Sequence, residues 1–420
     1  MNALYLLFML YMLSPKIDLF AFGGSAIRPE DAIFAVAAFL YVLKSHRTQV
    51  VLPRHVKVYL TFIAINFLSA IVNVPREGIT GFVFALRLVE YLGWFFILYE
   101  ACQRLSPDLM RKSLLLIASF FIVWGGLEAT GLIANVGKFG GAAQRLSLNT
   151  SGPFESSVMI AILADAAQQV IVTPALLVLL LLTQARITLI GAVTSFVIVR
   201  PGRGLAIGGL VIVVGLLFSG PLLTLYGGSR LATSSTASSM GDLLTKNWQS
   251  TPTIADPSYF REQFLGGRTL YDYLPDTRGD LSFKIRAVRW PIVIKSTLAQ
   301  PNSLVVGWGP GAWGSALDSY YVRIFGEVGL LGLLVFAAWV VVAVREARAK
   351  SVLLFSLLTM SIAGVFIDIF VSSKVMPLVW MFAALEAARH PSGLSSPMWR
   401  TPIRLLSPWA ARRSAREVAV

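Results

Sequence analysis

The sequence is poor in charged residues and contains very little cysteine. Only 14% of its 420 residues are Asp, Glu, Lys or Arg, whereas 56% are hydrophobic. A soluble domain has about 25% charged residues, so this composition, with a mean hydropathy of +0.70, predicts an all-α polytopic membrane protein without a separate soluble catalytic domain. The single cysteine, Cys102, excludes an intrachain disulfide and argues against a thiolate metal cluster.

The formal net charge is +14, but the basic residues do not form a stripe typical of nucleic-acid binding. Six arginines lie in the tail that begins at Arg389, and most other basic residues lie in short segments between apolar runs. This is the positive-inside pattern of membrane proteins, and we expect no nucleic-acid partner. The N-terminus lacks the basic region and small-residue cleavage site of a secretory signal, which predicts a retained first span.

About twelve apolar segments are candidates for membrane-spanning helices, although several are short for this role. They cover about 2–22, 31–44, 57–73, 80–101, 114–134, 153–169, 170–184, 187–199, 204–226, 319–344, 351–372 and 375–388. Lys and Arg are concentrated in the short connections of one side, which predicts that both termini are cytoplasmic. The predicted organisation is 1–226 for nine spans, 227–318 for a large outer loop, 319–388 for three spans, and 389–420 for a basic cytoplasmic tail.

The large outer loop has two parts that differ in composition. Residues 227–253 are rich in Ser, Thr and Gly, and we expect them to be irregular. Residues 280–300 have a helical apolar repeat, which predicts a helix that can lie against the membrane surface. Its apolar stripe consists of Phe283, Ala287, Trp290, Ile294 and Leu298. Arg286 and Arg289 lie beside this stripe, and by charge alone they can equally be ordinary solvated residues.

Most ionisable residues of the predicted spans fall at one depth, near the outer face. They are Arg87, Glu90, Glu128, Arg186, Asp318, Arg323, Glu327 and Asp368. Charges inside a membrane are costly and mark either function or a paired structural role, so their common depth suggests one polar cavity open to the outer leaflet. The pairs Arg87–Glu90 and Arg323–Glu327 also have the spacing of structural ion pairs on a helix, and that alternative stays open.

Histidine is also scarce, and its placement limits the chemistry of an outer site. His46, His55 and His390 all map to the predicted cytoplasmic side, so an outer site has no imidazole to act as a base or metal ligand. The sequence also has no compact carboxylate cluster, and we expect neither a metal nor a cofactor. The glycine-rich run 307–314 lacks the Lys-Ser/Thr pair of a nucleotide-binding loop and is interpreted as a tight turn back to the membrane.

Four segments arranged around the large loop together resemble the bacterial O-antigen ligase / O-antigen polymerase (Wzy-like) superfamily. They are Leu181–Arg186 (LLTQAR), Arg286–Trp290 (RAVRW), Val306–Gly311 (VGWGPG), and the stretch that runs from Asp318-Ser-Tyr-Tyr321 through Glu327-Val-Gly-Leu-Leu-Gly332. Residues 145–154 resemble the start of the family's sixth span more loosely. The order of these segments and their placement around one long loop carry the resemblance.

The resemblance implies transfer of a glycan from undecaprenyl pyrophosphate at the periplasmic face of the bacterial inner membrane, without a metal, cofactor or nucleotide sugar. The superfamily's ligases have histidine where this chain has Asp318, and asparagine is usual where it has Ser319. Both departures favour a polymerase of O-antigen or exopolysaccharide repeats. The alternatives are a ligase onto lipid A–core or another acceptor, and a flippase for lipid-linked oligosaccharides. Expected partners are the undecaprenyl-pyrophosphate-linked oligosaccharide and membrane lipids, with a chain-length regulator and a flippase as further candidates.

The resemblance also suggests roles for individual residues. Arg186 and Arg286 match the positions that would stabilise the pyrophosphate leaving group, since guanidinium groups bind phosphate oxygens bidentately. Asp318 is the expected base or orienting group for the attacking sugar hydroxyl, and Glu327 is the alternative base. The expected substrate-binding residues are Arg87, Arg145, Arg289, Trp290, Tyr320, Tyr321 and Arg323.

Overall fold

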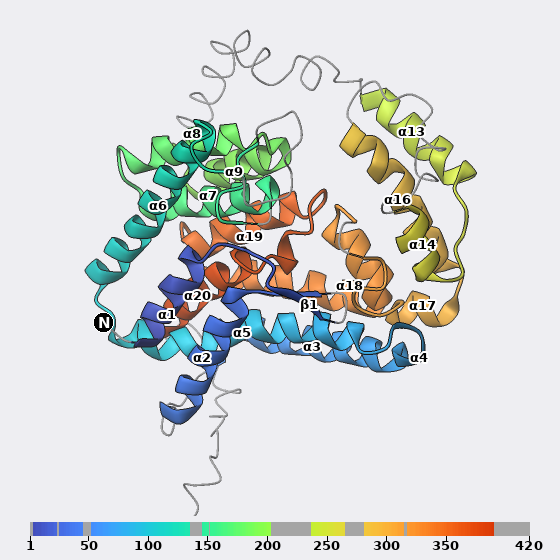
Figure 1. The fold of residues 1–420 in the computed structure, drawn as a ribbon, viewed down its shortest axis with the longest axis horizontal. Coiled ribbons are helices and arrows are strands. Elements are labelled where there is room, and N and C mark those ends of the chain that lie inside the picture. Colours follow the sequence, from blue (N-terminus) through green and yellow to red (C-terminus); the bar gives the residue numbers. More distant parts are fainter. Residues whose placement is uncertain are drawn as a thin grey trace, which may run out of the picture.

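The computed structural model describes residues 3–22, 25–44, 52–134, 145–150, 152–202, 237–264, 281–314 and 317–389. Within these ranges the regular structure is almost entirely α-helical, which confirms the all-α part of the predicted fold class (Figure 1). One small antiparallel hairpin pairs β1 (Phe20–Phe22) with β2 (Ser25–Ile27). The predicted span at 204–226 and the tail from 390 onward lie outside the described residues.

The helices fall before and after the stretch 203–236. Those before it are α1 (Ala3–Leu13), α2 (Pro29–Lys44), α3 (Arg54–Val72), α4 (Val74–Glu77), α5 (Thr80–Arg104), α6 (Pro107–Ala129), α7 (Pro153–Ala167), α8 (Val172–Leu182) and α9 (Arg186–Val199). Those after it are α13 (Ala237–Ser250), α14 (Pro257–Phe264), α16 (Leu281–Leu298), α17 (Pro301–Val306), α18 (Tyr320–Glu346), α19 (Val352–Ala363), the 3-10 turn η1 (Ile369–Val371) and α20 (Val375–Arg389).

Several of these helices have the properties of membrane spans. Among the described residues, α3, α5, α6 and α18 are long and apolar enough to cross a membrane by length and composition. The apolar helices α1, α8, α9 and α19 are shorter, with 10–17 residues. The length and composition of these helices are compatible with a polytopic membrane protein.

Two predicted spans are shorter in the structure than the apolar pattern suggested. The segment 2–22 forms α1, which ends at Leu13, because Pro15 follows closely and the residue before a proline avoids the helical conformation. The segment 351–372 forms α19, which ends at Ala363, and the chain then passes through η1 before α20 begins. The two hydrophobic runs therefore contain, besides a helix, residues that form turns and irregular connections between helices.

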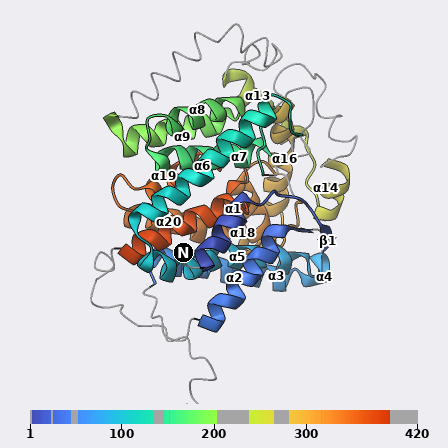
Figure 2. The same ribbon diagram turned by 60° about the vertical axis from the view of Figure 1, so that its left-hand side comes forward.

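The helices pack in two main groups, which are visible from two directions in Figures 1 and 2. In one group α5 packs on α3 and α20, and α18 packs along α3. In the other group α7 packs on α6, α8 and α9, and α19 packs on α9. An aromatic cluster joins three helices of the first group: the ring of Tyr59 on α3 lies 5.0 Å from Trp339 on α18 and 4.9 Å from Trp380 on α20.

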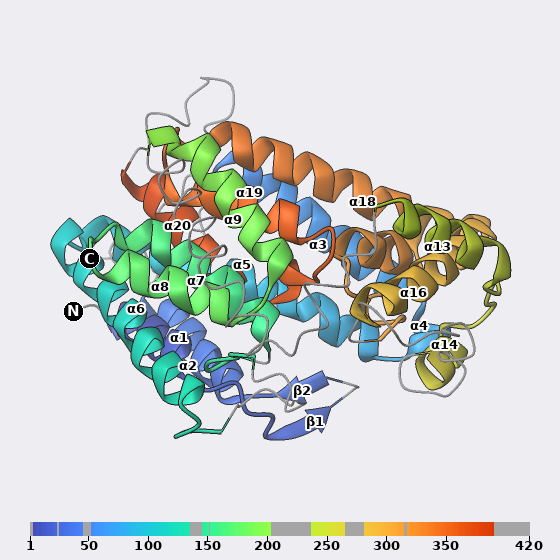
Figure 3. The same ribbon diagram turned by 90° about the horizontal axis from the view of Figure 1, so that it is seen from above.

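The helices of the predicted outer loop gather at one end of the α3–α18 pair. Figure 3 shows α13, α14 and α16 together on the right, beside the first part of α18. The arrangement is consistent with the packing of α16 and α17 on α18 and of α13 on α16. The Ser/Thr/Gly-rich stretch was predicted to be irregular, and this is wrong for 237–250, which form α13. The remainder of that stretch up to 236 lies outside the described residues.

The helix predicted at 280–300 is confirmed as α16, but its buried face differs from the predicted stripe. Val288, Ile292 and Val293 are buried, whereas Leu298 is 51% exposed. The buried face packs on a small apolar core that includes Trp308 and is built from the loop's own segments. The partners of α16 in the structure are therefore protein segments and not only a membrane surface.

Candidate functional site

The long helix α18 is interrupted at Gly329, which has φ 74° and ψ −169°. Because this residue leaves the helical conformation, carbonyls just before it need hydrogen-bond donors from elsewhere. The N–H of Trp308 donates to the Gly326 carbonyl at 3.0 Å. The N–H of Gly309 donates to the Glu327 carbonyl at 2.9 Å. The glycine-rich run thus supplies the hydrogen-bond donors that the helix lacks at its break. This role goes beyond the tight turn that was predicted for the run.

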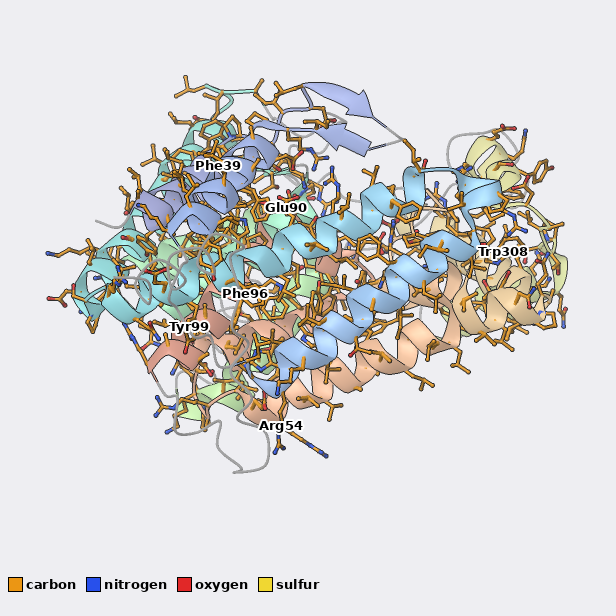
Figure 4. All side chains as sticks on the ribbon, turned by 90° about the horizontal axis from the view of Figure 1, so that it is seen from below. Phe39, Arg54, Glu90, Phe96, Tyr99 and Trp308 are labelled. Atoms are coloured by element: carbon orange, nitrogen blue, oxygen red, sulfur yellow. The ribbon has the colours of Figure 1, made fainter. Side chains whose placement is uncertain are left out.

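Two glycines make this crossing of backbones possible. A Cβ atom on Gly307 would lie 2.2 Å from the backbone carbon of Glu327, and one on Gly329 would lie 2.4 Å from the Val305 carbonyl oxygen. Both residues also have positive φ, 73° and 74° respectively. Glycine alone adopts this conformation readily and leaves room for the facing backbone. Figure 4 shows that Trp308, beside this crossing, lies at the opposite end of α3 from Arg54.

Arg323 is the centre of a buried ion-pair group on the first part of α18. Its guanidinium contacts Glu327 at 3.2 Å and Asp368 at 2.9 Å, and its side chain is only 3% exposed. The ion pair that the spacing of Arg323 and Glu327 predicted is therefore formed, and a role of Glu327 as a base stays a prediction. Asp368 comes from the connection between α19 and α20, so the group ties that connection to α18.

Asp368 also shapes the turn that leads into α18. Its Oδ2 accepts hydrogen bonds from the backbone N–H groups of Leu317 at 3.2 Å and Asp318 at 3.3 Å. Asp318 has a φ of 56°, in the left-handed region that few residues other than glycine adopt. Such strained residues often occur at functional sites. The Asp318 side chain is 30% exposed, whereas the Arg323 side chain is buried.

Arg286 on α16 faces this turn. Its Nε atom lies 3.8 Å from Oδ2 of Asp318, within ion-pair range but too far for a hydrogen bond. Among the described residues this buried Nε has no hydrogen-bond partner, although the Arg286 side chain is only 10% exposed. A guanidinium and a carboxylate therefore face each other with hydrogen-bonding capacity left over. We refer to Arg286, Asp318, Arg323, Glu327 and Asp368 as the charge cluster.

The neighbours of Arg286 hold α16 against the turn. The Trp290 Nε1–H donates to the Leu317 carbonyl at 3.0 Å, directly before Asp318. The Nε–H of Arg289, which is buried, donates to the Phe264 carbonyl at 3.2 Å. Both residues were predicted to bind substrate. The structure shows them positioning α16, and substrate contact stays a prediction.

The electrostatic surroundings of Asp318 are suited to acid–base chemistry. Burial raises the pKa of its carboxyl above the ordinary value, and the nearby Arg286 opposes this rise. Asp368 adds to the rise, whereas Arg289 and Arg323 lower the pKa. A carboxylate whose pKa is raised toward neutrality accepts protons more readily than an ordinary aspartate. The adjacent guanidinium can bind phosphate oxygens.

A second predicted group lies at the turn between α8 and α9. Arg145 donates to the carbonyl of Thr183 at 3.1 Å and that of Gln184 at 3.5 Å. Its guanidinium also lies 4.7 Å from the centre of the Phe154 ring. Arg186 follows as the first residue of α9 and is exposed. Arg145 thus supports the turn that presents Arg186, on helices that pack mainly among themselves and on α19.

The other predicted substrate-binding residues lie in different surroundings. Tyr320 is buried among aromatic rings, 5.0 Å from Phe336 and 5.1 Å from Phe370. The hydroxyl of Tyr321 donates to the Ser361 carbonyl at 2.9 Å, which ties α18 to α19. Arg87 is half-buried on α5. Substrate contact by these residues stays a prediction.

The structure adds an ion pair that sequence reasoning missed. Arg261 on α14 lies 2.6 Å from Glu77 on α4, and it also donates to the Ala312 carbonyl at 2.8 Å. This contact attaches the loop helices to the end of α3. Arg76 lies over the Trp308 ring at 4.5 Å. The two partners of the ion pair are 184 residues apart, and no local spacing could have identified them.

A second buried network lies where α1, α2, α7 and α20 meet. It consists of Lys16, Glu30, Glu155 and Lys374, with Tyr11, Ser14, Ser372 and Ser373, and we call it the Lys374 network. The ammonium of Lys374 donates to the Tyr11 carbonyl and, at 2.9 Å each, to the carbonyl and hydroxyl oxygens of Ser14. Lys16 contacts Glu155 at 2.8 Å. The network therefore anchors the start of α20 to α1 and α7.

Neither a search for metal-binding groups nor comparison with known proteins assigns a function to these sites. Among the described residues, no group of three or more His, Cys, Asp or Glu side chains is arranged to hold a metal ion. In comparisons with protein-family models, curated proteins and solved structures, nothing matched this chain.

Proposed function

We propose that this chain is a membrane glycosyltransferase that polymerises O-antigen or exopolysaccharide repeats. It takes glycan from an undecaprenyl-pyrophosphate donor and joins it to a lipid-linked repeat unit at the periplasmic face of the bacterial inner membrane. The observation that carries the proposal is the pairing of Arg286 with Asp318 at 3.8 Å, in which the buried Nε of Arg286 lacks a hydrogen bond among the described residues and the Asp318 carboxylate is partly exposed. One group suits the pyrophosphate and the other suits the sugar hydroxyl.

The proposed topology has about twelve spans, with both termini in the cytoplasm and the loop 227–318 in the periplasm. Support comes from the direction of the helices: α3 ends, and α5 and α18 begin, at the end of the molecule where α14 and α16 pack. In this topology Asp318 and Arg286 lie at the periplasmic end of α18, where the helix begins. A lipid-linked donor in the outer leaflet reaches this depth without leaving the membrane.

The proposed reaction requires a base and a site for the leaving group. The oxygen of an acceptor sugar hydroxyl attacks the anomeric carbon of the donor, and its proton passes to Asp318. The bond between the anomeric carbon and the phosphate oxygen breaks, and undecaprenyl pyrophosphate leaves with the electron pair. Arg286 neutralises the charge that develops on this leaving group, supported by Arg186 and Arg289. Fixed charges in a dry site typically contribute about 10²–10³-fold to turnover.

A lipid-linked oligosaccharide flippase is a second candidate, because α18 is broken at Gly329. Discontinuous helices at membrane depth are common in transporters, where the freed backbone groups and helix ends bind the substrate. In this chain the freed carbonyls of Gly326 and Glu327 accept hydrogen bonds from the glycine-rich run and are thus already in use. The polymerase proposal therefore remains the better supported of the two.

The first test follows the chemistry in proteoliposomes that contain a defined undecaprenyl-pyrophosphate-linked repeat unit. Wild type is expected to give a ladder of longer lipid-linked glycans and to release undecaprenyl pyrophosphate. Arg286→Gln and Asp318→Asn should each lower turnover by about 10²–10³-fold. Arg286→Lys should recover part of this loss, because lysine keeps the charge but not the planar fork.

The matched control is Lys246→Gln, which removes one exposed cation from α13. It should leave the ladder unchanged. Unchanged ladders from both Arg286→Gln and Asp318→Asn would overturn the site. Movement of an intact donor across the bilayer without cleavage would favour the flippase. In cells, a deletion strain should retain a single repeat on its acceptor, whereas long untransferred chains on the carrier lipid would indicate a ligase.

A further inference from the structure

The other end of the helix bundle has a pocket that the proposed reaction does not use. It has a volume of about 450 Å³ and is formed by the start of α6, the connection between α18 and α19, and the last turns of α20. The start of α6 and the ends of α18 and α20 lie toward the left in Figure 3, away from α16 on the right. Pockets of about 300–1,000 Å³ are typical of small-molecule sites.

The rim of this pocket is strongly basic. Four cationic side chains line it, namely Arg111 of α6, Arg348 and Lys350 of the α18–α19 connection, and Arg389 of α20, with one carboxylate, Glu386. Four positive charges and one negative charge give the lining a formal charge of +3. Arg111, Lys350 and Arg389 are exposed at the surface. They come from three separate segments, so the fold brings the charges together.

The single carboxylate of the rim has a structural contact. Oε2 of Glu386 accepts a hydrogen bond from the backbone N–H of Arg348 at 3.3 Å, which ties the α18–α19 connection to α20. The Arg389 guanidinium lies 4.0 Å from the sulfur of Met110 and is thereby held over α6. The opening of the pocket is thus fixed by contacts between its own walls. The positive charge of the rim exceeds what Glu386 can neutralise.

The floor of the pocket is apolar. Met110, Leu114, Leu353 and Phe382 line it, and all four are buried. A cationic rim above an apolar floor is complementary to a molecule with a phosphate at one end and hydrocarbon next to it. A free inorganic anion would satisfy the rim but would leave the floor in contact with water.

The position of the pocket in the bundle points to the same ligand. Short connections rich in Lys and Arg mark the cytoplasmic side of membrane proteins, and this pocket is formed around such a connection. The cytoplasmic leaflet carries anionic lipids, and basic pockets between helices on this side bind their headgroups. We propose that the pocket is a binding site for an anionic phospholipid of the inner leaflet, with the phosphate at the basic rim and an acyl chain over the apolar floor.

The test measures retention of lipid by the full-length protein in native mass spectrometry. Phosphatidylglycerol and phosphatidylcholine with identical acyl chains are added separately to delipidated protein. The test variant combines Arg111→Gln, Lys350→Gln and Arg389→Gln. The matched control combines Lys44→Gln, Lys57→Gln and Arg345→Gln, which removes three exposed cations near the same end of the bundle but outside the pocket.

Wild type should retain phosphatidylglycerol in preference to phosphatidylcholine, and the control should behave in the same way. The test variant should lose about a hundredfold in affinity for phosphatidylglycerol, since each of the three rim cations lies beside the bound headgroup and contributes about fivefold, whereas the control cations lie outside the pocket. Equal losses in test and control variants would mean general surface attraction and would overturn the proposal. Displacement of phosphatidylglycerol by an equal concentration of inorganic phosphate would mean a simple anion site and would overturn it as well.

If the triple variant does not fold, Lys350→Glu alone provides the same test. Lys350 is exposed in the connection between α18 and α19, and its substitution by glutamate reverses one charge of the rim. It should lower phosphatidylglycerol retention more than Lys57→Glu does. Equal retention by these two variants would overturn the proposal.

Discussion

The charge cluster and the Lys374 network are both buried groups of acids and bases, but they differ in how the donors of their cations are hydrogen-bonded and in how far their carboxylates are exposed. Lys374 and Glu30 are fully buried, and the three donors of the lysine ammonium are matched by three oxygens of Tyr11 and Ser14. Glu30 accepts from the Ser373 hydroxyl with Oε1, and its buried Oε2 lies 3.9 Å from the ammonium without a hydrogen bond among the described residues. In the charge cluster, Arg286 keeps a buried Nε without a hydrogen bond, opposite a carboxylate that is 30% exposed.

This difference teaches that a buried charge is not by itself a sign of function in a membrane protein. A buried cation costs little only when its donors are matched by acceptors, as those of Lys374 are, and in this sense the Lys374 network is closed. An open one retains capacity for a ligand at the cost of stability, and natural proteins accept this at functional sites. We therefore expect substitutions in the Lys374 network to affect folding first and substitutions of Arg286 or Asp318 to affect turnover first.

The largest expected effect concerns the backbone crossing that supports the charge cluster. Gly307→Ala would combine a positive φ with a Cβ atom 2.2 Å from the backbone of Glu327, and backbone cannot move aside as a side chain can. We expect the broken form of α18 to be lost, with little folded protein recovered from the membrane. Fluorescence size-exclusion chromatography of the solubilised protein measures this.

Two other glycines separate the causes in the Gly307 experiment. Gly78→Ala has positive φ but open space around the new Cβ, so it should cost only about 1–3 kcal/mol of conformational strain. Gly126→Ala, in α6 with open space and no positive φ, should be neutral or gain up to about 1 kcal/mol. Recovery of Gly307→Ala at the level of Gly78→Ala would contradict the steric argument.

The second effect tests the closed network directly. Lys374→Met removes a fully buried cation, which takes from Glu30 its ion-pair partner and from the two oxygens of Ser14 their shared donor. Removing one partner of a buried ion pair costs about 3–5 kcal/mol, so the melting temperature in detergent should fall sharply. Arg286→Gln should leave this temperature close to that of wild type. A stable but inactive Lys374→Met protein would mean that the two networks have the opposite roles.

The smallest expected effect is a shift in pH dependence at the open network. Asp318 acts as a base only when deprotonated, so turnover should rise as the pH increases through its raised pKa. Arg289 lowers this pKa, and Arg289→Gln should therefore move the rising limb of the pH–rate profile to higher pH. Lys246→Gln, an exposed cation on α13, should leave the limb in place. A shift in the opposite direction would exclude Asp318 as the titrating base.

The raised pKa also has a consequence for stability, with a definite sign. Between the ordinary pKa of an aspartate and the raised pKa of Asp318, the folded protein binds more protons at this residue than the unfolded chain does. The contribution of Asp318 to the free energy of unfolding therefore falls as the pH rises through this window. Asp318→Asn should remove this contribution, which thermal unfolding across the same pH range can measure.

Local sequence pattern was sufficient for the features that depend on neighbours along one helix. The apolar runs predicted an all-α membrane protein, because long hydrophobic segments are stable as helices in a bilayer. The pairing of Arg323 with Glu327 followed from their i, i+4 spacing, which places both side chains on one face whatever surrounds the helix. The helix α16 followed from its apolar repeat in the same way.

Only the tertiary structure decided which helices and which charged side chains contact one another. The buried face of α16 depends on Trp308 and its neighbours, which no repeat within the helix specifies. The break at Gly329 depends on the approach of the glycine-rich run, since a glycine can also remain helical. Asp368 joins Arg323 across 45 residues, and Lys374 joins Ser14 across 360. The sequence determines which groups can ionise and which segments are helical. The partners of these charges come from distant parts of the chain, because the packing of the helices sets the distances between charged groups and the separation along the sequence does not.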